Sequence, residues 1–449
     1  MKFLRLKIRR AKDAGVHSTP RFHAPASPMG NVSSRRQFLG RAVRGLGAMA
    51  LASRFGRRIA RAAEALTEME IAARFGEEKR LAGANWHHLE GAYNEAKPGI
   101  ERTAVGFLIR QMPAADLMNV NRDFVMHHVR ESLKARAEFP WGRTYPDAIF
   151  LSYVVPWRAS PSQPREMRDR LREHTARIVA GAKNELEACD MIQAFLDEKN
   201  GFSFGVPALD SSNPAWDPAR NPRGRNPPST YMLERGKRGL CGEYTHMFTM
   251  MCRSVGIPMR EVSIPRSDMP DTHAWAEAWT TGAGVVSPKS LKGEREFREG
   301  GKTYVGGFQP INTWGTWARA TKEWVVPYPM PEGDKKVAAF VTTEFERDGS
   351  GGMREVNITG NYLKDSSRIS ARCSTVPCTV GVVIEIGLPG GKKAHHPVFK
   401  AMATNNVLDL GEFARGNKYL VLRIDENWKQ LGPAVGIESL RENTPVNVP

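Results

Sequence analysis

The chain has 449 residues, of which 65 are Lys or Arg and 48 are Asp or Glu, so its formal net charge is +17. Residues 1–62 contain fifteen of the basic residues and one Asp, a net charge of +14, which leaves 17 − 14 = +3 for the remainder. This nearly neutral remainder has no zinc-finger spacing, no phosphate-binding glycine loop and no uncharged apolar run of ~20 residues, which excludes nucleic-acid binding and a membrane span as the basis of function.

The first 62 residues have the composition of a targeting segment. Arg35 and Arg36 stand in the sequence SSRRQFLG, which resembles a twin-arginine export signal, and a short apolar run follows at residues 45–52. Residues 60–62, Ala-Arg-Ala, are similar to a cleavage site. An organellar presequence or a disordered basic tail would also be rich in Arg and poor in acidic residues. We predict a twin-arginine leader over residues 1–62 and a mature protein that is periplasmic, at the cell envelope or extracellular.

Residues 63–179 show the spacing of amphipathic helices. Apolar residues recur at intervals of three and four in residues 69–81, 123–137 and 165–196. Prolines in residues 156–164 interrupt this pattern. The sequence therefore predicts a helical N-terminal region over residues 63–179, which we expect to form a cap or wall of a cleft.

Cys241 lies where a loop meets a predicted helix. Residues 206–230, rich in Pro, Asn, Arg and Gly, predict a long loop that either covers the site or is a surface excursion. An apolar stripe with helical spacing follows Cys241, includes Cys252 and ends at Gly256-Ile-Pro258. We expect Cys252 in the core. Because the unpaired N–H groups and the dipole at a helix N-terminus favour a thiolate, we expect the pKa of Cys241 to be lowered.

His273 begins a segment that alternates as a β-strand does. Two sets of residues alternate along it, namely His273, Trp275, Glu277 and Trp279 on one side and Ala274, Ala276 and Ala278 on the other. The small alanine side would allow a helix to pack closely against the strand. The sequence therefore predicts that the helix of Cys241 sits on that face or at the end of this strand. The other histidines are expected to be structural or surface residues.

These two segments resemble the sequence blocks of the transglutaminase-like superfamily, which are papain-like cysteine enzymes. The first block, Gly-x-Cys followed by an aromatic helix and Gly-Ile-Pro-x-Arg, matches residues 239–260, and the second, His-x-Trp-x-Glu, matches residues 273–277. The two blocks stand in the family's order, with the cysteine and histidine 273 − 241 = 32 residues apart. The resemblance covers roughly residues 180–325. It implies an α+β fold with a papain-like or transglutaminase-like core, which we place at residues 180–330.

The third block of the family, an Asp often followed by Pro, is not found here. Gln309-Pro310 stands in its place, and Asn312 follows two residues later, after the strand-like residues 304–308. A neutral amide can accept the imidazole N–H and orient the ring. The resemblance implies Gln309 as the third catalytic residue, because its proline matches the family's pattern, with Asn312 as the alternative.

The resemblance implies thiol chemistry on amide bonds. The thiolate of Cys241 would attack an amide carbonyl and His273 would protonate the leaving amine, which gives a thioester acyl-enzyme. Release to water makes the chain a peptidase or amidase, and release to an amine makes it a protein-glutamine acyltransferase. The expected partner is a peptide or protein substrate, with no cofactor and no metal. The alternative is a catalytically degenerate binding module at the cell envelope, and the lack of ligand spacing disfavours a metal-dependent hydrolase.

The pattern changes to a period of two in residues 334–449. Three apolar segments alternate in this way, at residues 338–346, 380–386 and 419–424, and turn-forming residues separate them. They predict a C-terminal antiparallel β-sandwich, for which a structural role is expected ahead of carbohydrate or protein binding. In an exported protein, Cys373 and Cys378 are also expected to form a disulfide.

Overall fold

The computed structural model describes most of the chain from residue 75 onward. The described residues are 75–159, 168–196, 203–204, 238–239, 241–265, 273–281, 295–299, 302–311, 337–348, 351–363, 365–387, 393–425, 428–438 and 440–449. The predicted leader (residues 1–62), the predicted loop (residues 206–230) and Asn312 lie outside them. Within the described ranges, no helix has both the length and the apolar character needed to cross a membrane.

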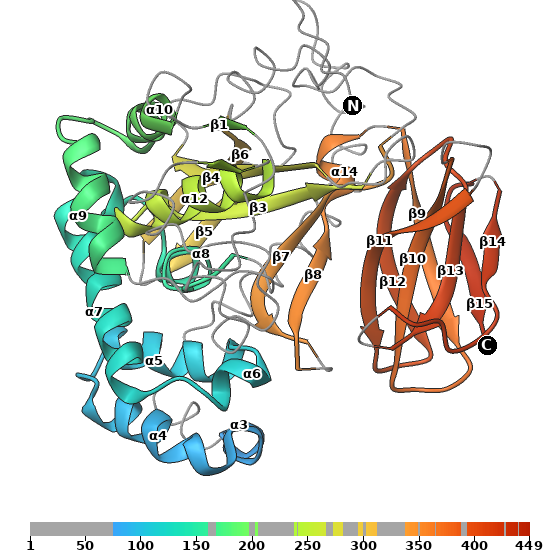
Figure 1. Cartoon of the computed structure of the whole chain (residues 1–449), viewed down its shortest axis with the longest axis horizontal. Coiled ribbons are helices and arrows are strands. Elements are labelled where there is room, and N and C mark those ends of the chain that lie inside the picture. Colours follow the sequence, from blue (N-terminus) through green and yellow to red (C-terminus); the bar gives the residue numbers. More distant parts are fainter. Residues whose placement is uncertain are drawn as a thin grey trace, which may run out of the picture. The chain divides into compact units, whose positions relative to one another are not determined.

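The N-terminal part of the described chain is helical, as the sequence predicts (Figure 1). Asn121 caps the longest of these helices by accepting the N–H of Phe124 at 2.8 Å. The helices are α3 (Gly76–Ala82), η1 (Gly83–Asn85), α4 (Trp86–Glu95), α5 (Ile100–Gln111), α6 (Ala114–Leu117), α7 (Arg122–Glu138), η2 (Pro140–Arg143), α8 (Asp147–Tyr153), α9 (Arg168–Ile178) and α10 (Glu185–Leu196).

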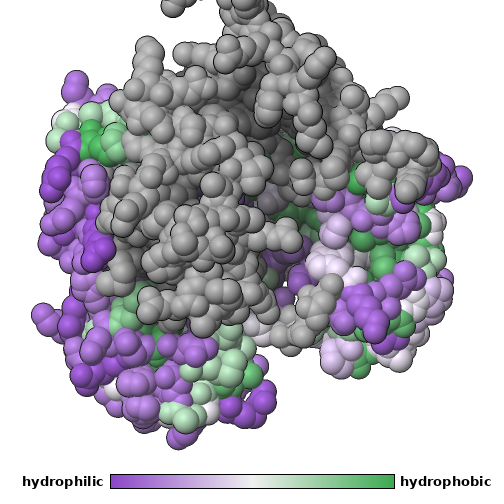
Figure 2. Space-filling model, in the orientation of Figure 1, coloured by the Kyte–Doolittle hydropathy of each residue, from purple (hydrophilic) through white to green (hydrophobic). Residues whose placement is uncertain are grey.

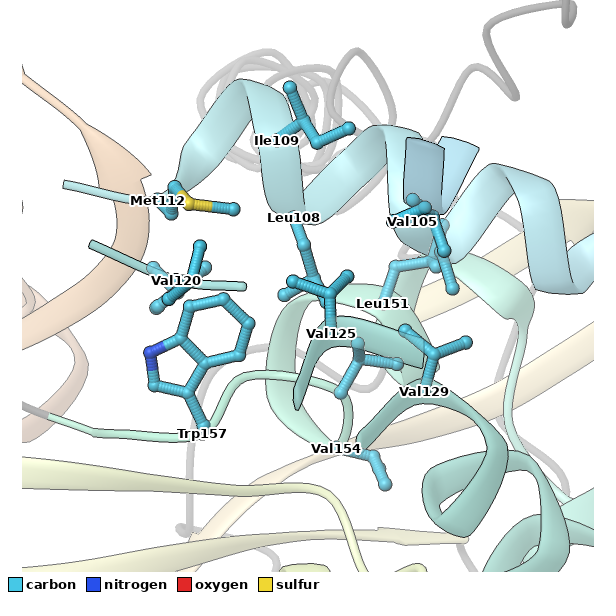
Figure 3. Close-up of a cluster of buried hydrophobic side chains, with 14 of the residues drawn as sticks. Val105, Leu108, Ile109, Met112, Val120, Val125, Val129, Leu151, Val154 and Trp157 are labelled. Carbon is cyan, nitrogen blue, oxygen red and sulfur yellow. The ribbon is translucent and has the colours of Figure 1, made fainter. Parts of the chain in front are cut away.

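Apolar residues of these helices converge in a core of their own. Leu108 of α5, Val125 of α7 and Trp157, which follows α8, are fully buried and point toward one another (Figure 3). The Trp157 indole N–H donates to the carboxylate of Asp116 at 3.0 Å, so its polar atom is satisfied inside the core. The outer side of these helices is predominantly hydrophilic in the view of Figure 2, as expected of amphipathic helices.

A six-stranded antiparallel sheet, called here the central sheet, follows in the chain. Its strand order is β5-β6-β4-β3-β7-β8. The strands are β3 (Met259–Ile264), β4 (His273–Thr281), β5 (Arg295–Glu299), β6 (Lys302–Pro310), β7 (Val341–Arg347) and β8 (Met353–Asn357). Strand β4, which begins at His273, therefore lies between β6 and β3, as its pairing on both sides confirms.

Helix α12 (Cys241–Ser254) packs on the alanine face of β4. Ala276 and Ala278 are fully buried in one cluster with Met247, Phe248 and other residues of α12. A strand face without large side chains lets the helix approach closely, and this expectation from the sequence is confirmed. Cys252 is fully buried in the same cluster, also as predicted.

The C-terminal end of α12 is held by side chains of the N-terminal helices. The last carbonyl groups of a helix have no partner within it. Here the Trp141 indole donates to the Val255 carbonyl at 2.7 Å, the Tyr145 hydroxyl donates to the Gly256 carbonyl at 2.6 Å, and Arg168 donates to the Arg253 carbonyl at 2.7 Å. Gly256 itself has a φ of 80°, the left-handed conformation of a helix C-terminal glycine, as the sequence predicts.

Aromatic residues cover the opposite face of β4. The rings of Trp279 and Phe308 lie 5.5 Å apart at 80°, and those of Phe308 and Tyr153 lie 4.5 Å apart at 67°. Such edge-to-face contacts are favourable aromatic geometry. Trp279 and Phe308 belong to the same buried cluster as the N-terminal helices. The central sheet is thus covered by α12 on one face and by the N-terminal helices on the other.

The C-terminal part of the chain is a β-sandwich, as predicted (Figure 1). One sheet has the order β11-β10-β13-β14 and the other β12-β9-β15. All the pairs in these sheets are antiparallel except β9 with β15, which is parallel. The strands are β9 (Ser366–Cys373), β10 (Cys378–Gly387), β11 (Lys393–Ala403), β12 (Val407–Ala414), β13 (Tyr419–Ile424), β14 (Val435–Ile437) and β15 (Thr444–Val448), and α14 (Thr359–Tyr362) precedes them.

The first strand assigned to the sandwich from sequence lies in the central sheet instead. Strand β7 pairs with β3 through Val262 opposite Thr342, and the hairpin of β7 and β8 forms the sheet's far edge. Hydrogen bonds then fix the sandwich to this hairpin, since the Lys400 N–H donates to Glu355 at 3.0 Å and Asn357 donates to the Leu410 carbonyl at 3.2 Å. The period of two in the sequence does not distinguish which sheet a strand joins.

A buried ion pair joins β3 to β4 inside the central sheet. Arg260 and Glu277 stand opposite each other in register, with Nε and Oε2 2.5 Å apart and both side chains almost fully buried. The Arg260 guanidinium also lies 4.3 Å above the ring of Phe308. Burial is the largest influence on both groups; for Arg260 the attraction of Glu277 overrides it, so that the pKa is raised. Burial also raises the pKa of Glu277, and the close contact of the two groups compensates for their removal from water.

We expect Glu277→Gln to destabilise the fold by about 3–5 kcal/mol, because it leaves the buried Arg260 charge without its counter-ion. The double variant Arg260→Met with Glu277→Leu should recover most of this loss, since both charges are then absent. Denaturant unfolding measures both free energies. Glu385→Gln, which breaks an exposed ion pair with Lys393, serves as the control and should change the midpoint little. Equal effects of Glu277→Gln and Glu385→Gln would contradict the importance of the buried pair.

Candidate active site

Cys241 is the first residue of α12, as the sequence predicts. The two residues Arg238–Gly239 just before it form the short strand β2, which pairs in parallel with β1 (Ser203–Phe204). All five cysteines lie in the described part of the chain and all are free, so the expected Cys373–Cys378 disulfide is not formed; Cys241 is the one that is not buried. The sulfurs of Cys189 and Cys252 lie 4.0 Å apart in the core behind α12. Cys241 is therefore the most accessible of the five thiols.

Opposing influences act on the pKa of the Cys241 thiol. Burial, the largest effect, raises the pKa of the Cys241 thiol, and the charge of Glu243 raises it further. Hydrogen bonds from the backbone of Ala274, of Gly242 and of Cys241 itself act in the opposite direction. The expectation that the helix N-terminus would lower this pKa is therefore wrong, because burial outweighs the N–H groups. A thiolate at this position needs a further positive partner.

Ala274 connects the first turn of α12 to the start of β4. Its backbone donates to the Cys241 sulfur, and its carbonyl accepts a hydrogen bond from the Thr245 hydroxyl at 3.2 Å. Cys241 and Thr245 are four residues apart and so lie on the same side of the helix. Both backbone groups of one β4 residue are thus bound to one helical turn.

His273 is the first residue of β4 and pairs with Ile264 of β3. It immediately precedes Ala274, whose N–H lies on the Cys241 sulfur. The described structure of His273 is limited to its backbone. The fold therefore brings the backbone of the predicted base to the predicted nucleophile, although 32 residues separate them in sequence.

Gln309 lies farther along the strand than its sequence context suggests. It pairs with Ala278 of β4, five residues from His273, which is roughly 17 Å along an extended strand. Ile311 is the last described residue of this segment, and its N–H donates to the Ala276 carbonyl at 3.1 Å. Asn312 comes next and lies outside the described residues. The register therefore separates Gln309 from the histidine.

Sequence reasoning missed two buried polar residues of α12. His246 is fully buried, and its Nδ1 lies 3.4 Å from the carboxylate of Glu261 on β3. Thr245 is also buried. Both residues lie in an otherwise apolar helical segment. Because buried polar groups need hydrogen-bond partners, their presence there could have indicated contacts with the sheet. Within the described ranges, no three His, Cys, Asp or Glu side chains lie close enough to hold a metal ion.

Removal of the Glu243 charge should lower the pKa of Cys241. The carboxylate disfavours the thiolate, so in Glu243→Gln the pH profile of Cys241 alkylation should shift to lower pH. Peptide mass spectrometry after iodoacetamide treatment over a pH series measures this profile. Glu90→Gln on the exposed side of α4 is the matched control and should leave it unchanged. A shift to higher pH in Glu243→Gln would contradict the electrostatic argument.

Comparison with known proteins places this site in a family. Residues 172–287 match the family model of the transglutaminase-like superfamily, and no curated protein matches the chain. One similar solved structure is a Cytophaga hutchinsonii protein assigned to the cysteine proteases, with 17% identity, a TM-score of 0.20 and coverage of 34% of this chain and 40% of that chain. Another is red sea bream transglutaminase, with 11% identity, a TM-score of 0.25 and coverage of 62% and 58%.

The chain thus spans less than two thirds of each of these proteins, 40% of one and 58% of the other. The matched segment includes α12 and β4, and so it contains both Cys241 and His273. Residues 172–287 of this chain therefore belong to the transglutaminase-like superfamily.

Proposed function

We propose that this chain is a cysteine enzyme that acts on peptide or protein amide bonds through a thioester. The observation that carries the proposal is the contact of the first turn of α12, which begins at Cys241, with the start of β4, where the Thr245 hydroxyl donates to the Ala274 carbonyl at 3.2 Å. Because His273 precedes Ala274 directly, this contact supports a place near the thiol for the backbone from which the imidazole extends. Cys241 is partly exposed, whereas the other four cysteines are buried, and this difference supports the same role.

In the proposed reaction the Cys241 thiol transfers its proton to the imidazole of His273, and the thiolate attacks the amide carbonyl carbon. The C–N bond then breaks, and the imidazolium returns the proton to the leaving amine. A thioester joins the acyl group to Cys241. Water, or a primary amine, next adds to the thioester carbonyl with His273 as the base, and the thiol is regenerated.

The raised pKa of Cys241 makes the histidine a requirement of this mechanism. A thiol whose pKa burial raises carries little thiolate at neutral pH. An imidazolium beside the sulfur would favour the thiolate by charge, as in other thiol enzymes with a histidine partner. The backbone N–H of Cys241 at the helix N-terminus is one suitable donor for the oxyanion of the tetrahedral intermediate.

For the third residue we favour Asn312 over Gln309. Gln309 pairs with Ala278 of β4. Two residues later, the Ile311 N–H donates to the Ala276 carbonyl, which is closer to His273 along β4, and Asn312 follows Ile311 directly. Each further residue of an antiparallel segment moves one position closer to His273. An amide at residue 312 is therefore better placed to accept the imidazole N–H than one at residue 309.

The raised pKa of Cys241 also supports one other function. A cysteine whose pKa is raised in the free protein is also compatible with a transglutaminase-like binding module that has lost catalysis. The two functions differ in whether Cys241 is needed for turnover or only contributes to the shape of the site.

An activity assay on the purified full chain tests the main proposal. Cleavage of labelled casein reports hydrolysis, and incorporation of a dansylated primary amine into casein reports acyl transfer. We expect one of the two in the wild type, and a loss of roughly 10³-fold or more in Cys241→Ala. Cys378→Ala in the sandwich is the control and should retain activity. If wild type and Cys241→Ala are equally inactive while both bind peptide, the binding module is the correct function.

A second assay ranks the orienting residues. Asn312→Ala should lower kcat roughly tenfold or more, because a histidine without an oriented ring is a poor acid and base. Gln309→Ala should change kcat little. Thermal unfolding of both variants checks that the fold is intact. The reverse ranking would return the orienting role to Gln309.

A further inference from the structure

We propose that Thr245 is a positioning residue, which holds His273 at the nucleophile by binding the carbonyl of Ala274. This inference rests on the proposed function of Cys241 and His273, and it concerns a residue outside the catalytic pair.

On the side of β4 that faces β6, the last described link between β6 and β4 is the bond from the Ile311 N–H to the Ala276 carbonyl. Backbone groups of residues two apart in a strand point the same way. The N–H and carbonyl of Ala274 therefore face the same side as those of Ala276. At Ala274 they are bound by α12, the N–H by the Cys241 sulfur and the carbonyl by the Thr245 hydroxyl. The first turn of the helix thus binds β4 on the side that faces β6.

These two bonds fix the peptide groups on both sides of Ala274. The N–H of Ala274 belongs to the peptide group that begins at the His273 carbonyl, so the bond to Cys241 determines where that group lies. The Thr245 bond, at 3.2 Å, holds the next peptide group against the same helical turn. Planar peptide groups leave few free dihedral angles between them. The position from which β4 presents His273 is therefore tied to α12.

The hydroxyl of Thr245 is directed away from the usual partner of a helical threonine. Within a helix a threonine hydroxyl often bonds the carbonyl four residues earlier, as Thr175 does to Leu171 at 2.7 Å in α9. Thr245 instead bonds β4 across the interface, and its side chain is 1% exposed. One turn later, Thr249 is also fully buried, and its hydroxyl has no hydrogen-bond partner among the described residues. The two threonines of α12 thus form a natural comparison.

The test uses Thr245→Val, which removes the hydroxyl at nearly constant shape, Thr245→Ser, which keeps it, and Thr249→Val as the matched control. The readout is the rate of Cys241 alkylation over a pH series, which needs no substrate. At pH 7 we expect Thr245→Val to react roughly three- to tenfold more slowly than wild type, the range that one hydrogen bond carries. Thr245→Ser should restore the rate, and Thr249→Val should match wild type.

The same substitutions in a His273→Ala background separate positioning from a direct effect on the thiol. Positioning through the histidine predicts that Thr245→Val slows alkylation no further once His273 is absent. A full additional effect in that background would overturn the proposal. It would also be overturned if Thr245→Ser were as slow as Thr245→Val, or if Thr249→Val were equally slow, because packing would then explain the loss.

The failure of this inference can be distinguished from failure of the proposed function. If wild type shows no turnover but its alkylation profile depends on His273 and Thr245, the positioning holds and the amide substrate class is wrong. If turnover depends on Cys241 and His273 but no profile responds to Thr245→Val, the proposed function holds and the role of Thr245 is wrong.

Discussion

The position of α12 is the constraint on which the rest of the site depends. The Arg253 carbonyl near its end and the Val255 and Gly256 carbonyls just after it accept hydrogen bonds from side chains of the N-terminal helical region. Its first turn is bound to the backbone of Ala274 on the central sheet. A helix held at both ends by different parts of the chain cannot shift along its axis without breaking buried hydrogen bonds. The sulfur of Cys241 therefore has a defined place relative to the start of β4.

The two faces of β4 serve this arrangement in different ways. The alanine face brings α12 close enough for side-chain and sulfur atoms to reach the strand backbone. The other face carries the Arg260–Glu277 pair and the aromatic residues that join the sheet to the N-terminal helices. Glu277 and Arg260 are motif positions of the family, yet they lie away from the sulfur in a buried pair. Their role here is to fix the register of β3 and β4, on which the position of His273 depends.

Several features followed from the sequence because local physics determines them. The apolar stripe predicted α12, Gly256 predicted its end, and the alternation around Ala276 predicted the face on which it packs. Other features depend on distant segments that no local pattern encodes. The pairing of β7 with β3 and of Gln309 with Ala278 is set by strand order and register. The pKa of Cys241 likewise depends on how much protein surrounds the sulfur, which the helix N-terminus alone does not reveal.

In the proposed mechanism, the burial of Cys241 limits when the reactive thiolate forms. A thiol whose pKa is raised stays protonated and reacts slowly with oxidants and adventitious electrophiles, because the thiolate is the reactive form. The backbone of Ala274, Gly242 and Cys241 acts against this rise and favours the thiolate. When an imidazole takes the proton, these backbone groups stabilise the thiolate. In this arrangement the helix N-terminus supports the thiolate once it forms, whereas its formation depends on how accurately the histidine is placed.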